Sequence, residues 1–402
     1  MSPTKVIIAG GGIAGPILAA VLKGKGYDPI IYERHDSIPD AGLSMCLQPN
    51  GLKVLCALPG LIESLEGKTI DRLLFQSVLP EDPGTLADSD APTKMKEAYG
   101  FGMFGVRRTT FHRQIIEYAE KNDVKIVWGH NVVGLEQDEN SVTVKFENGN
   151  TDTASFVVGC DGLHSATRIA LFGKEKAEFT GLVQTGGISP TPASLASVPT
   201  MMNVFGNGEH FIAYPVTDSL ISWATTRRES ESKETWAAMG EDKQQQFRQG
   251  SYSKWECGVG EVVQNAPKII KYGLYDRPEL KSWHRGRVVL LGDAAHPTSP
   301  HLGQGANQAF EDIALLTQLL HKYNPSAGEP STTTLETIFL EYETARIPRS
   351  SLLVKEARKQ GDGRVTQGVE ACKQRNNIIR AIYKDDESIA ANYAKVVKAK
   401  EE

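Results

Sequence analysis

The first 34 residues combine short apolar runs with a helical apolar pattern. Residues 6–9 (VIIA) and 29–33 (PIIYE) are apolar stretches of strand length, and each predicts a buried strand. Between them, Ile13, Ile17 and Val21 recur at the spacing of one face of a helix. The pattern predicts a strand–helix–strand unit at the N-terminus.

Further along the chain, the patterns favour antiparallel sheet. Residues 132–162 alternate with period two through three strands, with turns at 138–140 and 148–149, which predicts a β-meander. Residues 176–276 are also strand-like, apart from a polar helix around 231–250, and predict a separate sheet.

Three segments have patterns of other kinds. Residues 43–61 predict a strand, a turn at Pro49-Asn50-Gly51 and a short helix. Residues 79–100 are rich in Pro, Gly, Asp and Ser, so we expect a mobile surface loop. The tail from Leu335 is helical with no readable chemistry, and we interpret it as a solvated helical cap.

Composition excludes several classes of protein. The 402 residues are 40% hydrophobic and 23% charged, which is ordinary for a soluble globular chain. A net charge of −5 with no basic block argues against nucleic acid as a partner, and no apolar stretch approaches the roughly 20 residues of a membrane span. The N-terminus lacks a signal-peptide layout, and five cysteines without a CxxC pair predict reduced thiols in a cytoplasmic protein with no metal site.

The turn after the first strand carries a glycine fingerprint. Gly10, Gly12 and Gly15 form GxGxxG, in which the glycines permit a tight turn, close approach of a pyrophosphate, and close helix–strand packing. Glu33 ends the second strand, where a carboxylate accepts hydrogen bonds from an adenosine ribose. The unit therefore predicts dinucleotide binding, and the acid favours NAD or FAD over NADP without choosing between those two.

Two later strands also end on a carboxylate in a glycine turn. One ends at Cys160-Asp161-Gly162, and the apolar run 288–291 stops at Gly292-Asp293. If both lie at the carboxyl edge of a parallel sheet, Asp161 and Asp293 can accept bonds from sugar or ribityl hydroxyls. The segment GQGAN, 303–307, then opens a helix whose N-terminus offers partial positive charge to a flavin ring. Taken alone, Asp293 is equally consistent with a helix cap that binds no ligand.

The three motifs together resemble the class A FAD-dependent aromatic hydroxylases, the single-component flavoprotein monooxygenases that include fungal salicylate-hydroxylase-like enzymes. They are GxGxxG at 10–15, CDGLHSATR at 160–168 and GDAAHPTSPHLGQGANQAFED at 292–312. The segments RRTTFHRQI and LQPNGLKVL also fit, and the resemblance spans residues 5 to about 345 in the family's order.

The resemblance implies a fold and a division into domains. The implied α/β fold has an FAD-binding Rossmann-type βαβ domain with a β-meander, interleaved with a mixed-sheet substrate domain and followed by a C-terminal helical region. The expected boundaries are 1–175 and 277–334 for the discontinuous FAD-binding domain, 176–276 for the substrate domain, and 335–402 for the helices.

By position, the resemblance also implies the residues that bind FAD. The ADP half is expected at Gly10, Gly12, Gly15 and Glu33, with Arg34 beside them, and the pyrophosphate region at Arg108. Asp161 belongs to the motif associated with both FAD and NAD(P)H, Asp293 is expected to hold the ribityl chain, and Gly305, Ala306 and Asn307 to lie under the flavin ring. The expected set also includes Ile13, Ala14, Val132, Gly162, Pro300 and Gly303. FAD is expected to be bound non-covalently, and NAD(P)H to bind transiently because the chain has only one nucleotide fingerprint.

The implied reaction is hydroxylation or epoxidation of an electron-rich aromatic, indole or polyketide-like molecule by O2, through a flavin C4a-hydroperoxide. Tyr214 stands where several relatives place an active-site tyrosine, and His210 is a second candidate for catalysis, although a buried strand position is also typical of core residues. His296 and His301 are turn-packing residues or substrate contacts. The segment TGLVQTGGIS, 180–189, lacks an arginine common in fungal relatives, which makes a benzoate-like carboxylate substrate doubtful.

Other functions remain open from the sequence. An FAD-dependent oxidase or dehydrogenase of the same fold would retain all three motifs. A non-catalytic Rab-escort or GDP-dissociation-inhibitor type of protein shares the fold, but it would not need both strand-end carboxylates. A halogenase would carry a WxWxIP segment, which this chain lacks.

Overall fold

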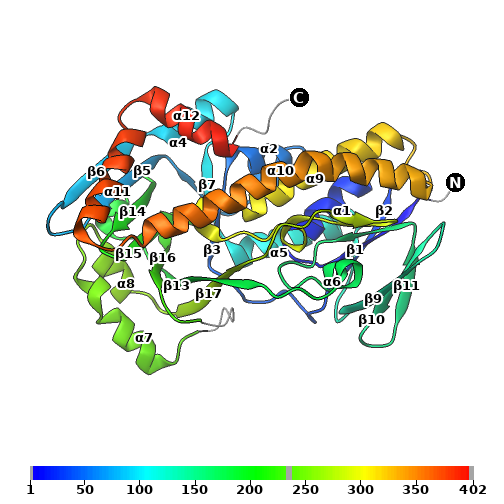
Figure 1. Ribbon diagram of the computed structural model, residues 1–402, viewed down its shortest axis with the longest axis horizontal. Coiled ribbons are helices and arrows are strands. Elements are labelled where there is room, and N and C mark those ends of the chain that lie inside the picture. Colours follow the sequence, from blue (N-terminus) through cyan, green and yellow to red (C-terminus); the bar gives the residue numbers. More distant parts are fainter. Residues whose placement is uncertain (1–2, 232–237, 398–402) are drawn as a thin grey trace.

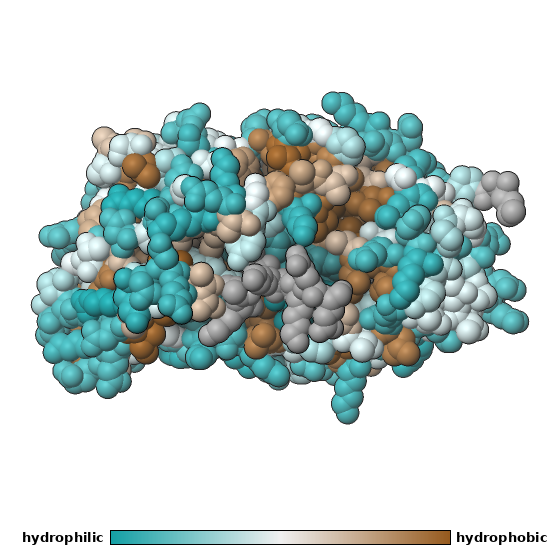
Figure 2. Space-filling model, turned by 90° about the horizontal axis from the view of Figure 1, so that it is seen from above, coloured by the Kyte–Doolittle hydropathy of each residue, from teal (hydrophilic) through white to brown (hydrophobic). Residues whose placement is uncertain are grey.

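The computed structural model describes residues 3–231 and 238–397 of the chain. Two bodies of sheet lie at opposite ends of an elongated molecule, and the long helix α10 (Thr332–Arg364) runs across both of them (Figure 1). Seen from above, the surface is mostly hydrophilic towards its two ends, with apolar side chains gathered nearer the middle (Figure 2).

The N-terminal unit forms as predicted and builds a parallel sheet. The strand order is β18-β19-β12-β1-β2-β8, in which β18 alone is antiparallel to its neighbour. The elements are β1 (Lys5–Ala9), α1 (Ala14–Gly24), β2 (Asp28–Tyr32), β8 (Lys125–Val127), β12 (Phe156–Gly159), β18 (His284–Arg285) and β19 (Val288–Leu290).

This strand order brings the three motifs together. The strands β1, β12 and β19 are parallel neighbours, with Ala9 opposite Gly159 and Gly159 opposite Leu290. The turns that follow them therefore leave the same edge of the sheet, which is where ligands bind in open α/β folds. The predicted convergence of the glycine fingerprint with the two strand-end carboxylates is confirmed.

Helices pack on this sheet through one large apolar core. The helix α1 contacts both α5 and α9, and α9 also contacts α2 and α10. These helices are α2 (Pro49–Leu55), α5 (Arg108–Lys121) and α9 (Gly305–Tyr323). Two shorter helices are α3 (Leu61–Ser64), which follows α2 in the chain, and α6 (Ala166–Phe172), which follows β12. The turn predicted at Pro49-Asn50-Gly51 is wrong: Pro49 begins α2, because proline is well accepted where a helix starts.

Two smaller sheets complete this end. The predicted meander is confirmed as β9 (Val132–Gln137), β10 (Val142–Phe146) and β11 (Thr151–Ala154), all antiparallel. A second three-stranded sheet, β3-β7-β4, consists of β3 (Ser44–Leu47), β4 (Lys68–Ile70) and β7 (Met103–Arg107).

The second body is a seven-stranded sheet in the order β17-β13-β16-β15-β14-β5-β6. Its strands are β5 (Arg72–Ser77), β6 (Gly84–Ser89), β13 (Glu178–Pro190), β14 (Thr200–Phe205), β15 (Glu209–Pro215), β16 (Leu220–Arg228) and β17 (Ile269–Asp276). Since β5 and β6 precede residue 176, the expected boundary between the first two domains divides this sheet. One face is covered by α7 (Glu241–Arg248) and α8 (Val259–Gln264), while residues 232–237 of the predicted polar helix lie outside the described part of the chain.

The loop predicted for residues 79–100 is wrong over most of its length. It contains β6, which forms a hairpin with β5, and α4 (Ala91–Tyr99). Several of its apolar side chains, including Leu86, Ala91 and Met95, are buried. Of the Pro and Asp residues that suggested a loop, Asp90 is the N-cap of α4 and Pro92 lies in its first turn, where both residue types are favoured.

The C-terminal region is helical, as predicted, but it is not a solvated cap. The helix α10 is followed by α11 (Val369–Ile382) and α12 (Asp386–Val397). Buried residues of α10 extend from Leu335 near its start to Arg364 at its end. Apolar side chains of α11 and α12 pack on the seven-stranded sheet, and the Tyr383 ring lies 4.5 Å from that of Phe75. In the described residues, no helix has the length and apolarity needed to cross a membrane.

Candidate FAD site

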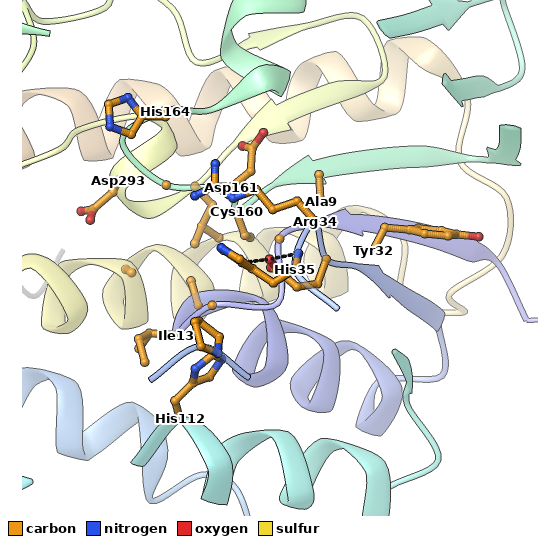
Figure 3. Close-up of a pocket in the computed structure, with 18 of the residues that line it drawn as sticks. Ala9, Ile13, Tyr32, Arg34, His35, His112, Cys160, Asp161, His164 and Asp293 are labelled. Carbon is orange, nitrogen blue, oxygen red and sulfur yellow. Dashed lines mark hydrogen bonds and ion pairs between the residues drawn. The ribbon is translucent and has the colours of Figure 1, made fainter. Parts of the chain in front are cut away.

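A single cavity opens at the carboxyl edge of the parallel sheet and receives residues from all three motifs (Figure 3). Most of the residues that the resemblance implies for FAD line it: Gly10, Gly12, Ile13, Ala14, Glu33, Arg34, Arg108, Val132, Asp161, Gly162, Asp293, Gly305 and Ala306. Gly15, Pro300, Gly303 and Asn307 are not among its lining residues.

The three fingerprint glycines are small for three different reasons. Gly10 has φ of +106°, and a Cβ there would lie 2.6 Å from the Cys160 carbonyl oxygen. A Cβ on Gly15 would lie 2.1 Å from the Gly10 oxygen, so Gly15 is needed for packing and not for ligand contact. A Cβ on Gly12 would meet nothing within 4 Å, because Gly12 faces the cavity. This is the geometry in which a diphosphate approaches the start of α1.

Glu33 is held as an ionised acceptor at the end of β2. It accepts hydrogen bonds from the Gly11 amide at 2.7 Å, the His35 amide at 3.0 Å and His35 Nδ1 at 2.6 Å. Burial opposes ionisation, but these donors outweigh it and lower the pKa of Glu33. A carboxylate in this state suits a ribose diol, which donates hydrogen bonds.

Asp293 has a carboxylate with no hydrogen bond or ion pair to the described residues. Asp293 lies deep in the protein, but more than a third of its surface is accessible to solvent. This accessible surface is the part that lines the cavity. Burial raises the pKa of Asp293, and the charges of His296 and Arg108 oppose this only in part. An unsatisfied acceptor at this depth fits a polyhydroxyl chain such as ribityl.

Asp161, in contrast, is occupied by the protein itself. Its oxygens accept from Ser165 Oγ at 2.5 Å, the Thr167 amide at 2.9 Å and Thr167 Oγ1 at 3.0 Å. The carboxylate therefore fixes the turn that starts α6, and burial still raises the pKa of Asp161 despite these donors. As strand-end carboxylates Asp161 and Asp293 have the same expected chemistry, but only the carboxylate of Asp293 lacks a hydrogen bond to the described residues.

Arg108 supplies the positive charge in the cavity wall. Its guanidinium is buried, donates to the Ala41 carbonyl at 2.7 Å and interacts with the charge of Asp293. Burial lowers the pKa of Arg108. A Cβ on Gly42 would lie 2.5 Å from Arg108 Cδ, so Gly42 leaves the space through which the arginine reaches the cavity.

Asn307 does not line the cavity, and its side chain instead holds neighbouring segments of the chain together by hydrogen bonds. Its side chain accepts from the Gln48 amide at 3.0 Å and donates to the carbonyls of Cys46 at 3.1 Å and Gly303 at 2.7 Å. These hydrogen bonds tie the start of α9 to β3 and α2. This leaves the amides of Gly305 and Ala306 at the cavity, where a helix N-terminus favours negative charge.

A buried ionic network, which sequence reasoning missed, holds the Gly292-Asp293 turn. Asp312 accepts from the Gly292 amide at 3.0 Å, from His296 Nε2 at 2.6 Å and from Arg346 Nε at 2.6 Å. His296 is therefore a turn-packing residue. The neighbouring charges of His296 and Arg346 outweigh burial and lower the pKa of Asp312.

Other lining residues were also missed. They include His35, Met45, His112, Cys160 and His164. His112 donates through Nε2 to the Gly11 carbonyl, and its Nδ1 has no partner in the described part of the chain. It lies four residues after Arg108 on α5, so the i, i+4 spacing was the available signal that both share one helix face.

The two candidate catalytic residues lie outside this cavity, on the seven-stranded sheet. Tyr214 Oη lies 2.7 Å from Ser44 Oγ, and Ser44 Oγ donates to Ser222 Oγ at 2.7 Å. Met45, which follows Ser44, lines the FAD cavity, so this chain of hydroxyls adjoins it. His210 is fully buried on the same strand as Tyr214, with Nε2 at 3.1 Å from Asn203 Oδ1.

Comparison with known proteins decides the family, because residues 3–357 match the FAD binding domain. The chain belongs to this family of flavoproteins. It is 30% identical over 363 residues to a 3-amino-4-hydroxybenzoate 2-monooxygenase of Streptomyces platensis, covering 89% of this chain and 87% of the relative. It is 27% identical over 354 residues to a 6-hydroxynicotinate 3-monooxygenase of Pseudomonas fluorescens, covering 86% and 88% respectively.

A solved structure agrees at the level of the fold. The HpxO protein of Klebsiella pneumoniae, in complex with FAD and uric acid, superposes with a TM-score of 0.83 at 23% identity, over 98% of this chain and 96% of that one. The resemblance to class A aromatic hydroxylases, the α/β fold class, FAD as cofactor and the FAD-dependent monooxygenase activity are confirmed together.

Proposed function

We propose that this monooxygenase hydroxylates a small electron-rich aromatic molecule held between the FAD cavity and the seven-stranded sheet. The observation that carries the proposal is the carboxylate of Asp293, which has no hydrogen bond to the described residues and lies in a cavity where three motifs meet. The hydrogen-bonded hydroxyls of Tyr214 and Ser44 lie next to this cavity. Relatives named for 3-amino-4-hydroxybenzoate and 6-hydroxynicotinate support a substrate with one aromatic ring.

The residues around the cavity fit the parts of FAD. Glu33 would hold the adenosine ribose, the start of α1 the diphosphate, Asp293 the ribityl hydroxyls, and the N-terminus of α9 the ring, with Arg108 adding positive charge. The chemistry that FAD supplies when bound is oxidation of NAD(P)H and activation of O2. The protein contributes binding, orientation and exclusion of water. NAD(P)H would bind transiently, because the chain has one nucleotide fingerprint.

Tyr214 is placed to orient a substrate hydroxyl. Ser44 Oγ can donate its single proton to Ser222, and in that arrangement Tyr214 donates its own proton to Ser44. Its oxygen is then left as an acceptor for a substrate O–H. Burial raises the pKa of Tyr214, so the residue acts as a neutral phenol that passes polarisation along the hydroxyls and not as a phenolate base.

The test is NAD(P)H oxidation by the purified yellow protein with a panel of phenols, aromatic acids and indoles. We expect at least one compound to stimulate oxidation and to be recovered with one oxygen atom from O2. Tyr214→Phe should lower that hydroxylation rate by about 100-fold or more. Tyr118→Phe is the matched control, since Tyr118 Oη donates to the Pro59 carbonyl near the surface and Tyr118 does not line the FAD cavity.

The same assay separates the rival activity. An oxidase or dehydrogenase would consume its substrate without substrate-stimulated NAD(P)H oxidation, and that result would refute hydroxylation. We also propose a cytoplasmic location, supported by five cysteines that are all unpaired. Fractionation of the native host with the protein in a secreted or membrane pool would contradict it.

A further inference from the structure

A second cavity lies apart from the FAD cavity, between the two domains and α10. It is bounded by the start of β13, the end of β17, the residues that follow Asp293, and residues 350–358 of α10. Its volume is about 300 Å³, at the lower end of the range for small-molecule sites. It shares no lining residue with the FAD cavity, so the cofactor does not account for it.

Two carboxylates stand opposite each other at this cavity. Glu178 and Asp276 are direct partners on the antiparallel strands β13 and β17. Arg358 of α10 lies 3.1 Å from the carboxylate of Asp276 and 3.8 Å from that of Glu178, so one arginine is shared by two acids. Like charges directly opposite on paired strands are destabilising. The group formed by these three residues keeps one negative charge.

The other cations of the cavity wall are engaged elsewhere. Lys355 pairs with Glu279 at 3.9 Å. Arg277 donates to two backbone carbonyls, that of Leu163 at 2.9 Å and that of Glu175 at 2.6 Å. Neither cation therefore compensates the pair of opposed carboxylates.

Asp276 presents a free oxygen to the cavity. The residue is 4% exposed, and its Oδ1 accepts from Arg358 Nη2 at 3.1 Å. Its Oδ2 forms no hydrogen bond to a described residue, yet it is not closed off from solvent, so its accessible surface belongs to the cavity. Burial raises the pKa of Asp276, the charge of Arg358 opposes this, and the charge of Glu178 adds to it. A cation beside Oδ2 would stabilise the ionised carboxyl.

His296 brings a second free acceptor to the same cavity. It is 7% exposed, and its Nε2 donates to the carboxylate of Asp312, which leaves Nδ1 of the neutral ring as an acceptor. Nδ1 forms no hydrogen bond in the described part of the chain. Unlike Nδ1 of His112, which is closed off from solvent, it retains accessible surface. Two side chains that are more than nine-tenths buried thus present free acceptors to one cavity.

The remaining floor of the cavity is apolar. Leu280, Trp283 and Pro297 are all buried there, and the Trp283 ring lies 5.0 Å from that of His296. A metal ion would need several ligating side chains, and the described residues contain no group of three or more that could hold one. Free acceptors, an excess negative charge and apolar walls together fit an organic cation.

We propose that this cavity binds a small organic cation, a protonated amine or amidine carried on a flat apolar body. Its N–H groups donate to Asp276 and His296, and its charge balances the carboxylate that Arg358 leaves uncompensated. Its apolar body packs on Leu280 and Trp283. The site is separate from both the FAD cavity and the proposed substrate site, so the inference does not depend on the proposed function.

The experiment measures binding to the FAD-loaded protein by isothermal titration calorimetry. The probes are benzamidine and benzylamine, and their neutral counterparts are benzamide and benzyl alcohol. We expect the better cation to bind at least about 10-fold tighter than its counterpart, as one charge-assisted hydrogen bond implies. Asp276→Asn keeps the size of the side chain and should weaken binding of the cation by about 10-fold or more, while changing that of the neutral probe by less than about threefold.

Three further variants locate the binding. Val354→Trp fills the cavity from α10 and should abolish binding of the cation. Tyr214→Phe, at the proposed substrate site, should leave the affinity within about twofold, as one neutral hydroxyl outside the cavity implies. Asp88→Asn is the matched control, because Asp88 also pairs with an arginine, Arg72, but lies on β6 at the opposite edge of the same sheet.

Several results would overturn the inference. They are equal binding of a cation and its neutral counterpart, saturation by neither cation, unchanged binding in Asp276→Asn, or loss of binding in Tyr214→Phe. Glu178→Gln removes the same charge from the exposed member of the pair and should weaken cation binding by about threefold, so the test does not depend on the folding of Asp276→Asn alone.

The outcome is separable from that of the proposed function. Binding of a cation that requires Asp276, in a protein that hydroxylates none of the aromatic compounds, would support the site and refute the function. Hydroxylation of an aromatic compound by a protein that binds neither cation would support the function and overturn the site.

Discussion

Replacement of Asp293 by asparagine tests the cofactor site most directly. The carboxylate is enclosed, faces the cavity and bonds to nothing in the described residues, so its partner is expected to be the ribityl chain. Hydrogen bonds to a charged group contribute about 1.5–3 kcal/mol, so Asp293→Asn should raise the Kd for FAD by about 10- to 150-fold. The assay is titration of the apoprotein with FAD, in which the quenching of flavin fluorescence reports binding.

The same substitution should not lower the folding stability of the apoprotein, although it weakens FAD binding. Because burial raises the pKa of Asp293, the folded apoprotein holds this proton more tightly than the unfolded chain. The associated stabilisation is complete below the unfolded pKa and is lost as pH rises through the folded value. At neutral pH the apo form of Asp293→Asn should therefore be at least as stable as the unmodified protein, and the difference should shrink as the pH falls towards the range where carboxyls protonate.

Asp161→Asn is the matched control at the neighbouring strand end. Asp161 is equally enclosed, but its oxygens are occupied by Ser165 and Thr167. Loss of this turn should cost about 1–3 kcal/mol of folding free energy, measured by thermal or denaturant unfolding of the apoprotein. An unchanged Kd for FAD in Asp293→Asn, or an equal loss of stability in both variants, would refute the different roles assigned to the two carboxylates.

Three further predictions follow from the geometry of the site. Gly15→Ala should prevent stable folding because its Cβ meets a backbone oxygen at 2.1 Å, whereas Gly12→Ala should fold and bind FAD more weakly; soluble yield and FAD titration distinguish them. Arg346→Ala removes the buried arginine that bonds both Glu311 and Asp312, leaving these carboxylates only Arg349 and His296 as charged partners, and should cost about 3–5 kcal/mol in denaturant unfolding, against about 1 kcal/mol or less for the half-exposed Arg358→Ala. Arg108→Ala should raise the Kd for FAD by the equivalent of about 1.5–3 kcal/mol, and unchanged affinity on titration would contradict its role in the cavity wall.

Local sequence was sufficient for the parts of this protein that neighbouring residues specify. The βαβ unit, the meander and the helical tail follow from periodicity and turn residues, and the turn at Gly10 has a backbone geometry that favours glycine. The convergence of three motifs was also predictable, because parallel strands all present their carboxyl ends at one edge of the sheet. Local sequence gave the wrong prediction for residues 79–100, since β6 is a strand only through its pairing with β5.

Tertiary structure alone decided which polar groups remain free. Asp161 and Asp293 occupy similar turns in the sequence, but Ser165 and Thr167 satisfy the first and nothing in the described residues satisfies the second. Likewise, nothing near Arg364 in the sequence shows that it will be buried beside His301, with no ion pair to any described residue. Hydrogen bonding and charge compensation depend on atoms brought together from distant parts of the chain, and a pattern of neighbouring residues contains no record of them.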